Sequence, residues 1–151
     1  MDMIRRNTDY ALRLMINLAR NYSKGTVSSR QLAEKEEVSY QLTCKLLQKL
    51  NTAGLVKSQM GPKGGFFLSK DPSEINFAAI VEVIQGPITV NSCLLDINAC
   101  SRQSNCPVKK ELTELQKYIK SFFNNVTLDK FLKRRKSNTE IKKKISKEKT
   151  E

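Results

Sequence analysis

The sequence of 151 residues contains no histidine and only four cysteines. Without histidine, the chain lacks the side chain most often used as a general base near neutral pH. It also has no phosphate-binding loop and no nucleophile elbow. These absences argue against an enzyme. An iron–sulfur electron carrier is conceivable, but such a function would not explain why the first half of the chain is basic.

Long apolar runs are missing as well. No stretch approaches the roughly 18 to 20 apolar residues needed to cross a bilayer. The start, MDMIRRNTDYALRLM, has charges where a signal peptide would have its apolar segment. We therefore expect a soluble, cytoplasmic protein that makes no membrane contact. In such a reducing compartment, closely spaced cysteines indicate metal binding or redox chemistry rather than structural disulfides.

The net charge of +12 is unevenly distributed. Residues 1–70 carry 12 Lys or Arg and 5 Asp or Glu, residues 71–132 carry 6 and 7, and residues 133–151 carry 9 and 3. This distribution predicts a module that binds a polyanion, joined to a neutral part. The basic tail has almost nothing to bury and is predicted to be disordered. It is either a solubilising tail or a secondary contact with nucleic-acid phosphates.

Apolar periodicity and capping signals predict three helices in the first third of the chain. Thr8 is the expected N-cap of the first helix, with Asp9 in its first turn. Ser28 and Gln31 have the spacing of a capping box at the start of the second helix, and Ser39 is the expected N-cap of the third. Two short helices joined by a tight turn are typical of a helix-turn-helix.

A hairpin is predicted directly after the third helix. In GLVKSQMGPKGGFFLSK, residues 54–70, a turn rich in Gly and Pro separates two β-prone runs. A helix-turn-helix followed by such a hairpin is a winged helix. The expected fold class is therefore mainly α with a small β-hairpin wing, that is, a winged helix-turn-helix domain followed by a long dimerisation helix.

The outer face of the third helix is the predicted DNA-reading surface. Its amide and lysine side chains can bond base edges or phosphates in the major groove, although the same residues would suit an ordinary solvated face. The glycine-rich hairpin tip lets the backbone approach a phosphate or the minor groove closely. Cys44 is interpreted as a small residue at the edge of this face, with a redox switch as the alternative. The predicted DNA-binding residues are Ser39, Tyr40, Gln41, Cys44, Lys45, Gln48, Gly61, Pro62, Lys63, Gly64 and Gly65.

Two more helices are expected after the hairpin, the second of them long. Asn76 is the predicted N-cap of the first, which Gly86 closes, and Pro107 is the predicted first residue of the second. Apolar residues spaced 4, 3, 4, 3 and 4 along the second indicate the seam of a coiled coil between two subunits. Packing of this helix against its own domain is the alternative. The seam residues are Val108, Leu112, Leu115, Ile119, Phe122 and Val126.

Three of the four cysteines lie in CLLDINACSRQSNC, residues 93–106, with the spacing C-x6-C-x5-C. Thiolates are soft ligands that suit iron–sulfur clusters, zinc and copper(I). The spacings are longer than the C-x2-C knuckle of structural zinc sites. The residues alone leave three readings open, namely an iron–sulfur cluster, a single metal ion such as zinc, and metal-free thiols that sense by oxidation.

Taken together, these stretches resemble the IscR/NsrR-type winged-helix transcription regulators. The resemblance rests on TDYALR, VSSRQLAE, VSYQLTCKLLQKLNTAGLVKS, GPKGGFFL, INFAAIVEVIQGP and the three-cysteine loop before a long helix, over roughly residues 1–130. It implies a homodimeric regulator that binds double-stranded operator DNA and holds a [2Fe–2S] or [4Fe–4S] cluster. Met60 departs from the family pattern, because many relatives carry arginine just before the wing glycine.

The resemblance also implies a ligand set for the cluster, made of Cys93, Cys100 and Cys106. Asp9 of the partner subunit is the expected fourth ligand, because TDYALR matches the stretch from which some nitric-oxide-responsive relatives supply a carboxylate. Asp96, Glu111 and an exogenous small thiol are the reserve candidates. Members without a cluster answer other signals, and typically they lack the three cysteines.

The sequence thus predicts four parts. These are a winged helix-turn-helix DNA-binding domain (1–86), a cysteine-rich cluster-binding loop (87–106), a dimerisation helix with a short C-terminal helix (107–132), and the basic tail (133–151). The expected function is transcription regulation in which the cluster senses nitric oxide, redox state or the supply of iron or clusters. A metal-free regulator of the same fold, responding to thiol oxidation or to sulfur metabolism, is the alternative.

Overall fold

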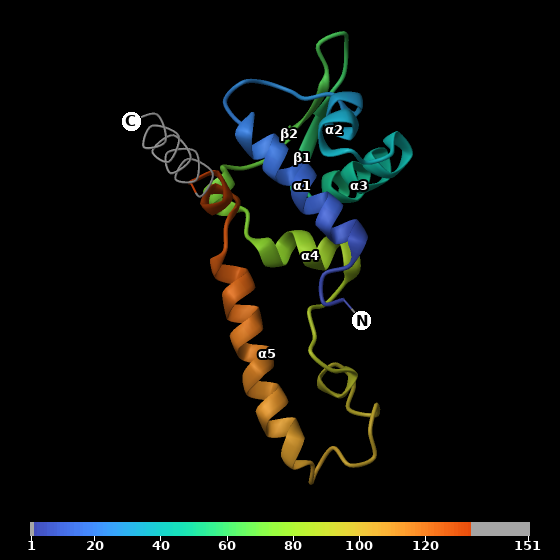
Figure 1. Cartoon of the computed structure of the whole chain (residues 1–151), viewed down its shortest axis with the longest axis vertical. Coiled ribbons are helices and arrows are strands. Elements are labelled where there is room, and N and C mark those ends of the chain that lie inside the picture. The colour runs from blue at the N-terminus through green and yellow to red at the C-terminus, as the bar shows by residue number, and fades with distance from the viewer. Residues whose placement is uncertain (1, 134–151) are drawn as a thin grey trace, which may run out of the picture.

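The computed structural model describes residues 2–133, so most of the predicted basic tail lies outside the described residues. Figure 1 shows a head that carries the hairpin at one end, and a long helix with a loop beside it that project from the other end. Residues 128–133 are helical as well. In chain order the elements are α1 (Arg6–Arg20), α2 (Ser29–Glu36), α3 (Tyr40–Thr52), β1 (Val56–Gln59), β2 (Gly65–Leu68), the 3-10 turn η1 (Pro72–Glu74), α4 (Phe77–Gln85), the 3-10 turn η2 (Ser92–Leu94) and α5 (Pro107–Asn125).

The predicted helix-turn-helix is present as α2 and α3. Ser28 and Gln31 form a complete capping box before α2, and the Ser39 hydroxyl accepts a hydrogen bond from the Leu42 amide at the start of α3. Between the helices, Glu37 takes a left-handed conformation with φ of 54°, which ends α2 and turns the chain. The local sequence signals therefore set both ends of the turn.

The predicted hairpin is present as β1 and β2, paired antiparallel from Val56 opposite Leu68 to Gln59 opposite Gly65. Val27, just before α2, adds a bridge to Phe66, so the hairpin is fastened to the helix-turn-helix. This contact requires glycine at position 65, where φ is +157° and a Cβ atom would lie 2.6 Å from the backbone of Val27. The wing is thus held at its base rather than hanging free.

The prediction of Thr8 as an N-cap is wrong. The N-cap of α1 is Arg5, without a side-chain cap, and Thr8 lies inside the helix, fully buried. Its hydroxyl donates a hydrogen bond to Oε1 of Gln85 at 2.6 Å. The Thr8 hydroxyl therefore bonds Gln85, at the end of α4, instead of capping its own helix. Asp9 lies in the first turn of α1, as predicted.

The main core lies around α1, which contacts α2, α3, α4 and β2. Leu46, Leu47 and Leu50 of α3 enter this core fully buried, and the partly buried Leu42 packs against it, as the helical spacing predicted. Leu128, beyond α5, also joins this core, so the chain returns to the head after its excursion. The Lys133 ammonium and the Thr127 hydroxyl bond the Asp129 carboxylate there and lower the pKa of that carboxyl.

A smaller core joins α4 to α5, with Phe77 and Phe123 in edge-to-face contact at 4.8 Å between ring centroids. Only part of the predicted α5 seam remains free. Ile119 packs into this core, whereas Leu115 and Phe122 are exposed beside Tyr118, which is 71% exposed. Packing against its own domain, the alternative prediction for this helix, therefore accounts for Ile119, and a dimer contact through the exposed positions stays a prediction. Within residues 2–133, no helix is long and apolar enough to cross a membrane.

We predict that Thr43→Val raises the free energy of unfolding by about 1 kcal/mol, because Thr43 is fully buried and its hydroxyl has no partner among the described residues. Thr8→Val is the matched control, since the equally buried Thr8 does make a hydrogen bond and its loss costs about 1 kcal/mol. Urea unfolding measures both, and a Thr43→Val protein less stable than the wild type would contradict the assignment.

Candidate functional site

The predicted reading face lies on the outside of α3. Gln41, Lys45 and Gln48 are exposed, and Cys44 is half-buried at the edge of the face. Tyr40, which is exposed, begins the helix and receives the Arg30 guanidinium over its ring at 5.7 Å from the centroid. The face is therefore polar and free of ion pairs between the described residues.

The wing tip forms a second exposed part of the head, at the top of Figure 1. Gly61, Pro62 and Lys63 are exposed, Gly64 and Gly65 are partly buried, and Met60 is 92% exposed. The Thr26 hydroxyl donates a 2.8 Å hydrogen bond to the Lys63 carbonyl, which fixes the tip relative to the start of α2.

A groove of about 410 Å³ separates the wing tip from α2. Arg30 and Lys63 are among its lining residues, together with the acidic Glu34, so two cations and one carboxylate border the same groove. Sequence reasoning named Lys63 and missed Arg30. The signal that could have found Arg30 is its place two residues after the Ser28 cap, in the first turn of a helix that precedes the reader.

Charged and polar side chains fix the turn between α2 and α3 to α1. The Asn17 amide donates to Oε1 of Glu36 at 2.7 Å, while Arg13 donates to the Glu36 carbonyl and lies 3.5 Å from its carboxylate. The Glu36 side chain is only 14% exposed, whereas the Arg13 side chain is 37% exposed, so the carboxylate is the shielded member of the pair. The angle between the two helices of the reading unit therefore depends on α1.

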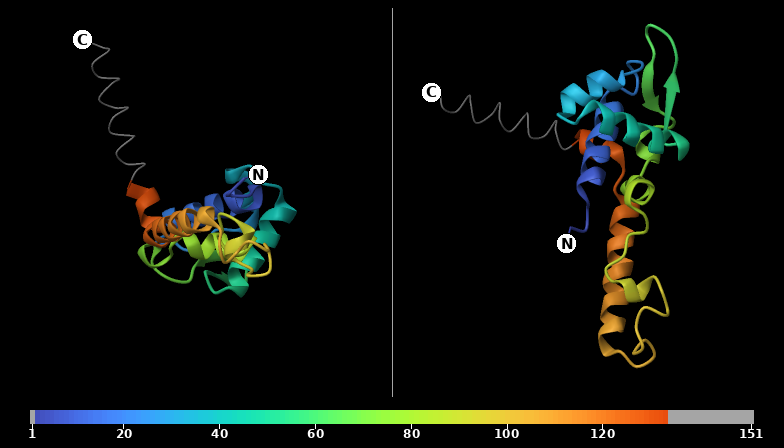
Figure 2. Two further views of the ribbon diagram at one scale, coloured as in Figure 1. Left: turned by 90° about the horizontal axis from the view of Figure 1, so that it is seen from below. Right: turned by 90° about the vertical axis from the view of Figure 1, so that its right-hand side faces the viewer.

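The cysteine loop connects α4 to α5 and lies beside α5, as Figure 2 also shows. All of its thiols are free, with Cys93 and Cys106 half-buried and Cys100 exposed. Within residues 2–133, no three His, Cys, Asp or Glu side chains are placed to hold a metal ion. The structure therefore places the three predicted cysteine ligands on one loop without gathering their sulfurs.

A glutamine organises this loop. The Gln103 amide donates to the carbonyls of Cys93 and Asp96, both at 2.8 Å, and its oxygen accepts from Lys109 of α5. The Asp96 carboxylate itself accepts a hydrogen bond from the Asn98 amide at 2.8 Å, within the loop. All polar groups of the Gln103 side chain are thus used to fold the loop against α5.

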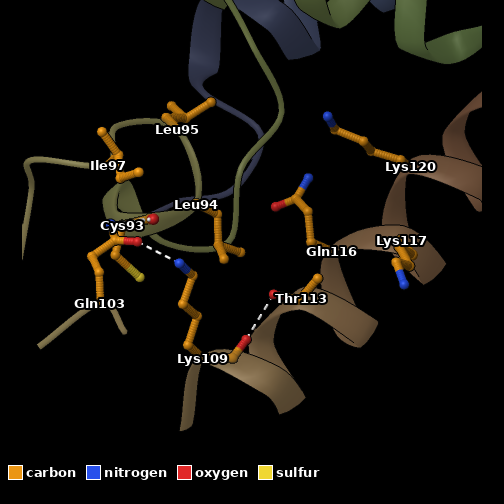
Figure 3. A pocket seen from close by; sticks show the side chains of 10 residues that line it. All are labelled: Cys93, Leu94, Leu95, Ile97, Gln103, Lys109, Thr113, Gln116, Lys117 and Lys120. Carbon is orange, nitrogen blue, oxygen red and sulfur yellow. Dashed lines mark hydrogen bonds between the residues drawn. The ribbon is translucent and has the colours of Figure 1, made fainter. Parts of the chain in front are cut away.

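A groove of about 440 Å³ opens between the loop and α5, and Cys93 lines it. Figure 3 shows the loop on one side and α5 on the other, with Gln116 between them. The lining residues are Cys93, Leu94, Leu95, Ile97, Gln103, Lys109, Thr113, Gln116, Lys117 and Lys120.

The predicted carboxylate ligands lie elsewhere. Asp9 is exposed on α1, and Glu111 is exposed on α5, and neither forms a metal-holding group with the cysteines of the described chain. Asp9 is next in the chain to Thr8, whose hydroxyl donates a hydrogen bond to Gln85 at the end of α4. Gln85 also accepts from the Arg5 amide at 3.1 Å and donates to the Met3 carbonyl at 2.9 Å. The start of α1 is therefore tied to the end of α4.

A buried glutamine holds the first part of the loop. Gln116 of α5 accepts from the Val90 amide and donates to the Ile88 carbonyl, both at 2.7 Å. Sequence reasoning missed Gln85, Gln103 and Gln116. Only Gln116 had a signal in the sequence. It is a polar residue next to the seam residue Leu115, on a helix whose other buried residue is apolar.

Comparisons with known proteins agree with this architecture. The model of the Rrf2 family, described as an iron-dependent transcriptional regulator, matches residues 4–134. The chain belongs to the Rrf2 family. Among Rrf2-type relatives, the HTH-type transcriptional regulator CymR of Bacillus subtilis is 31% identical over 121 residues, or 80% of this chain and 82% of CymR. The regulator IscR of Serratia proteamaculans is 29% identical over 119 residues, or 79% of this chain and 72% of IscR.

Solved structures extend the Rrf2 comparison to the fold. The structure of CymR, the global cysteine regulator of B. subtilis, has a TM-score of 0.73 at 29% identity and covers 85% of this chain and 95% of its own. T. potens IscR has a TM-score of 0.72 at 26% identity and covers 87% of each chain. The oxidised form of Staphylococcus aureus CymR has a TM-score of 0.66 at 29% identity, with coverages of 85% and 93%. The predicted winged-helix regulator fold is confirmed.

Gln116→Leu is predicted to destabilise the Rrf2-type fold by about 1–3 kcal/mol, because it leaves the Val90 amide and the Ile88 carbonyl unpaired. Hydrogen exchange should accelerate at the Val90 amide and in the loop that follows. Gln41→Leu, at an exposed glutamine with no hydrogen bond to the described residues, is the control and should change neither quantity. Unaltered exchange at Val90 in Gln116→Leu would show that the tether is unimportant.

Proposed function

We propose that this protein is a homodimeric transcription regulator of the bacterial-type Rrf2 architecture, acting on operator DNA in the cytoplasm, whose DNA affinity is controlled by an iron–sulfur cluster. One observation carries the proposal. Three free thiols occupy the loop that joins α4 to α5. Gln116 of α5 bonds the start of this loop, and Gln85, at the end of α4, accepts a hydrogen bond from Thr8 of α1, the helix that contacts both α2 and α3. A change at the cysteines therefore has a physical route to the DNA-binding face.

The DNA contact is assigned to α3 and the wing. With α3 in the major groove, Gln41, Lys45 and Gln48 reach base edges or phosphates, and Ser39, Tyr40 and Cys44 lie at the margin of the same face. The wing residues 61–65 approach the adjacent phosphates or minor groove. Positions 1–70 carry 12 cationic and only 5 acidic residues, and this positive charge supports the assignment.

Dimerisation is assigned to α5. Val108, Leu115, Tyr118 and Phe122 leave a row of exposed apolar side chains along the helix, which no other part of the described chain covers. The row follows helical spacing, so two copies related by a two-fold axis can bury it against each other. A two-fold dimer also presents two α3 helices to two half-sites of an operator.

The donor set of the loop suits an iron–sulfur cluster in its chemistry. Three thiols, none of them in a disulfide, are available as soft ligands on one loop, and cationic rather than acidic side chains line the groove beside Cys93. Cys93, Cys100 and Cys106 would hold the cluster, either [2Fe–2S] or [4Fe–4S], and Asp9 of the partner subunit is the proposed fourth ligand. When bound, the cluster supplies a redox-active centre that reacts with nitric oxide or oxidants and depends on iron supply.

The residues of the chain must then adjust, because the three sulfurs are not gathered in the described arrangement. Cys106 is the N-cap of α5 and Cys93 is in η2, so both sit on ordered elements, whereas Cys100 lies on the exposed turn between them. Cluster binding would therefore require the loop between Cys93 and Cys106 to rearrange.

A metal-free thiol regulator is the second candidate. The likeness to CymR, a global cysteine regulator with an oxidised form, favours it. The exposed Cys100 would be its first site of oxidation, because access to solvent controls thiol reaction rates together with thiolate character.

The cluster proposal predicts that the anaerobically purified protein is coloured and contains iron. Separate Cys93→Ala, Cys100→Ala and Cys106→Ala substitutions should remove the visible absorbance, since each deletes one thiolate ligand. Cys44→Ala is the matched control and should keep it. A wild-type protein that stays colourless and free of iron after reconstitution would instead favour the thiol regulator, whose DNA affinity should fall reversibly on oxidation.

The assignment of the DNA-binding face predicts that Lys45→Ala and Lys63→Ala each weaken binding to a duplex selected by the wild type from a random pool. Each should also lower the slope of log K against log salt by about 0.9, because one phosphate contact releases its counterion. Lys117→Ala, on α5, is the control. Fluorescence anisotropy at several salt concentrations measures this, and unaltered slopes in both head variants would place the DNA elsewhere.

A further inference from the structure

The groove between the cysteine loop and α5 has two unlike walls (Figure 3). On the loop side, Leu94, Leu95 and Ile97 provide aliphatic surface, and Ile97 is 77% exposed. On the α5 side, three lysines, Lys109, Lys117 and Lys120, line the groove. An aliphatic wall facing a cationic wall is complementary to a molecule that has an apolar part and an anionic group.

The groove is lined by positive charge, although residues 71–132 as a whole carry slightly more acidic than basic residues. Residues 71–132 carry six Lys or Arg and seven Asp or Glu, yet three of those cations line the groove and none of the acidic residues does. The groove is thus more cationic than the part of the chain that contains it.

The three lysines are not equally available. Lys117 pairs with Glu114 at 2.8 Å near the surface, and Lys109 donates to Gln103. Lys120 forms no hydrogen bond or ion pair with any of residues 2–133, and Figure 3 shows its side chain directed toward the loop side of the groove. Lys120 is therefore the cation left to receive a ligand.

We propose that this groove is a binding site for a small aliphatic carboxylate, with the carboxylate at Lys120 and the hydrocarbon part against Leu94, Leu95 and Ile97. The exposed aliphatic wall favours an organic anion over an inorganic one, because only the organic anion buries apolar surface there. The volume of about 440 Å³ accommodates a chain of several carbon atoms.

Cys93 lines the same groove, so an occupied groove restricts access to its thiol. The carboxylate would thereby act as an effector that holds the loop against α5 and keeps Cys93 covered. This consequence for regulation rests on the proposed function of the cysteines, whereas binding of the carboxylate itself does not.

The test uses the full-length, iron-free protein and octanoate as the probe. Isothermal titration should show saturable binding of octanoate, with much weaker binding of 1-octanol, which lacks the charge, and of inorganic phosphate, which lacks the chain. Lys120→Gln should weaken octanoate binding by about two- to fivefold, as expected for an ion pair at an exposed lysine. Lys110→Gln, an exposed lysine of α5 outside the groove, should leave it unchanged.

A second measurement locates the probe. Octanoate should slow alkylation of Cys93 by N-ethylmaleimide, followed by peptide mass spectrometry, and should do so less in Lys120→Gln. Equal binding of octanoate and 1-octanol, or equal binding to the Lys120→Gln and Lys110→Gln proteins, would overturn the proposal. A protein that binds octanoate but never acquires iron would keep this site and refute the cluster, while a coloured protein indifferent to octanoate would do the reverse.

Discussion

The burial of α1 is the constraint on which the rest of the structure depends. More than half of this 15-residue helix is buried, including the polar side chains of Thr8 and Asn17. Buried polar groups are costly unless they are hydrogen-bonded, so α1 has to bring its partners with it. Glu36 at the end of α2 supplies the partner for Asn17, and Gln85 at the end of α4 supplies the partner for Thr8. One helix thereby fixes the reading unit relative to the helix that leads into the cysteine loop.

Local signals were sufficient for much of the head. Caps such as Ser28 and Asn76 act within a few residues of themselves, and each is present where the spacing predicts it. The wing turn is also present as predicted, although Gly65 is required by the distant backbone of Val27. Thr8 shows where this reasoning stops. Thr-Asp before an apolar run has the form of an N-cap, but its hydroxyl is taken by Gln85, 77 positions away, and the helix begins earlier at Arg6. A distant partner leaves no trace in local spacing.

Helix α5 shows a second limit. Its apolar spacing was read as a single seam for a partner subunit, with packing on its own domain as the alternative. In the structure, the arc toward the head includes Ile119 and also Phe123, which lies outside the seam, while Leu115 and Phe122 face outward. Spacing identifies which residues share a face, but it does not say what meets that face. The same limit explains why the loop glutamines were missed, since an isolated polar residue has no periodicity.

Gln103 and Gln116 bond the cysteine loop to α5, whereas Gln85 bonds the end of α4 to the start of α1. An arrangement that brings the three sulfurs together must rearrange the loop between η2 at Cys93 and the start of α5 at Cys106. The chain before η2 is bonded to α5 by Gln116 and follows α4 directly, so under the proposed function a rearranged loop would act on α4 through the chain itself and through the packing of α4 on α5. Gln85 would carry that change from the end of α4 to the first turn of α1. Because α1 is a packed helix roughly 22 Å long, it should shift as a rigid body and displace Glu36 at the turn between α2 and α3.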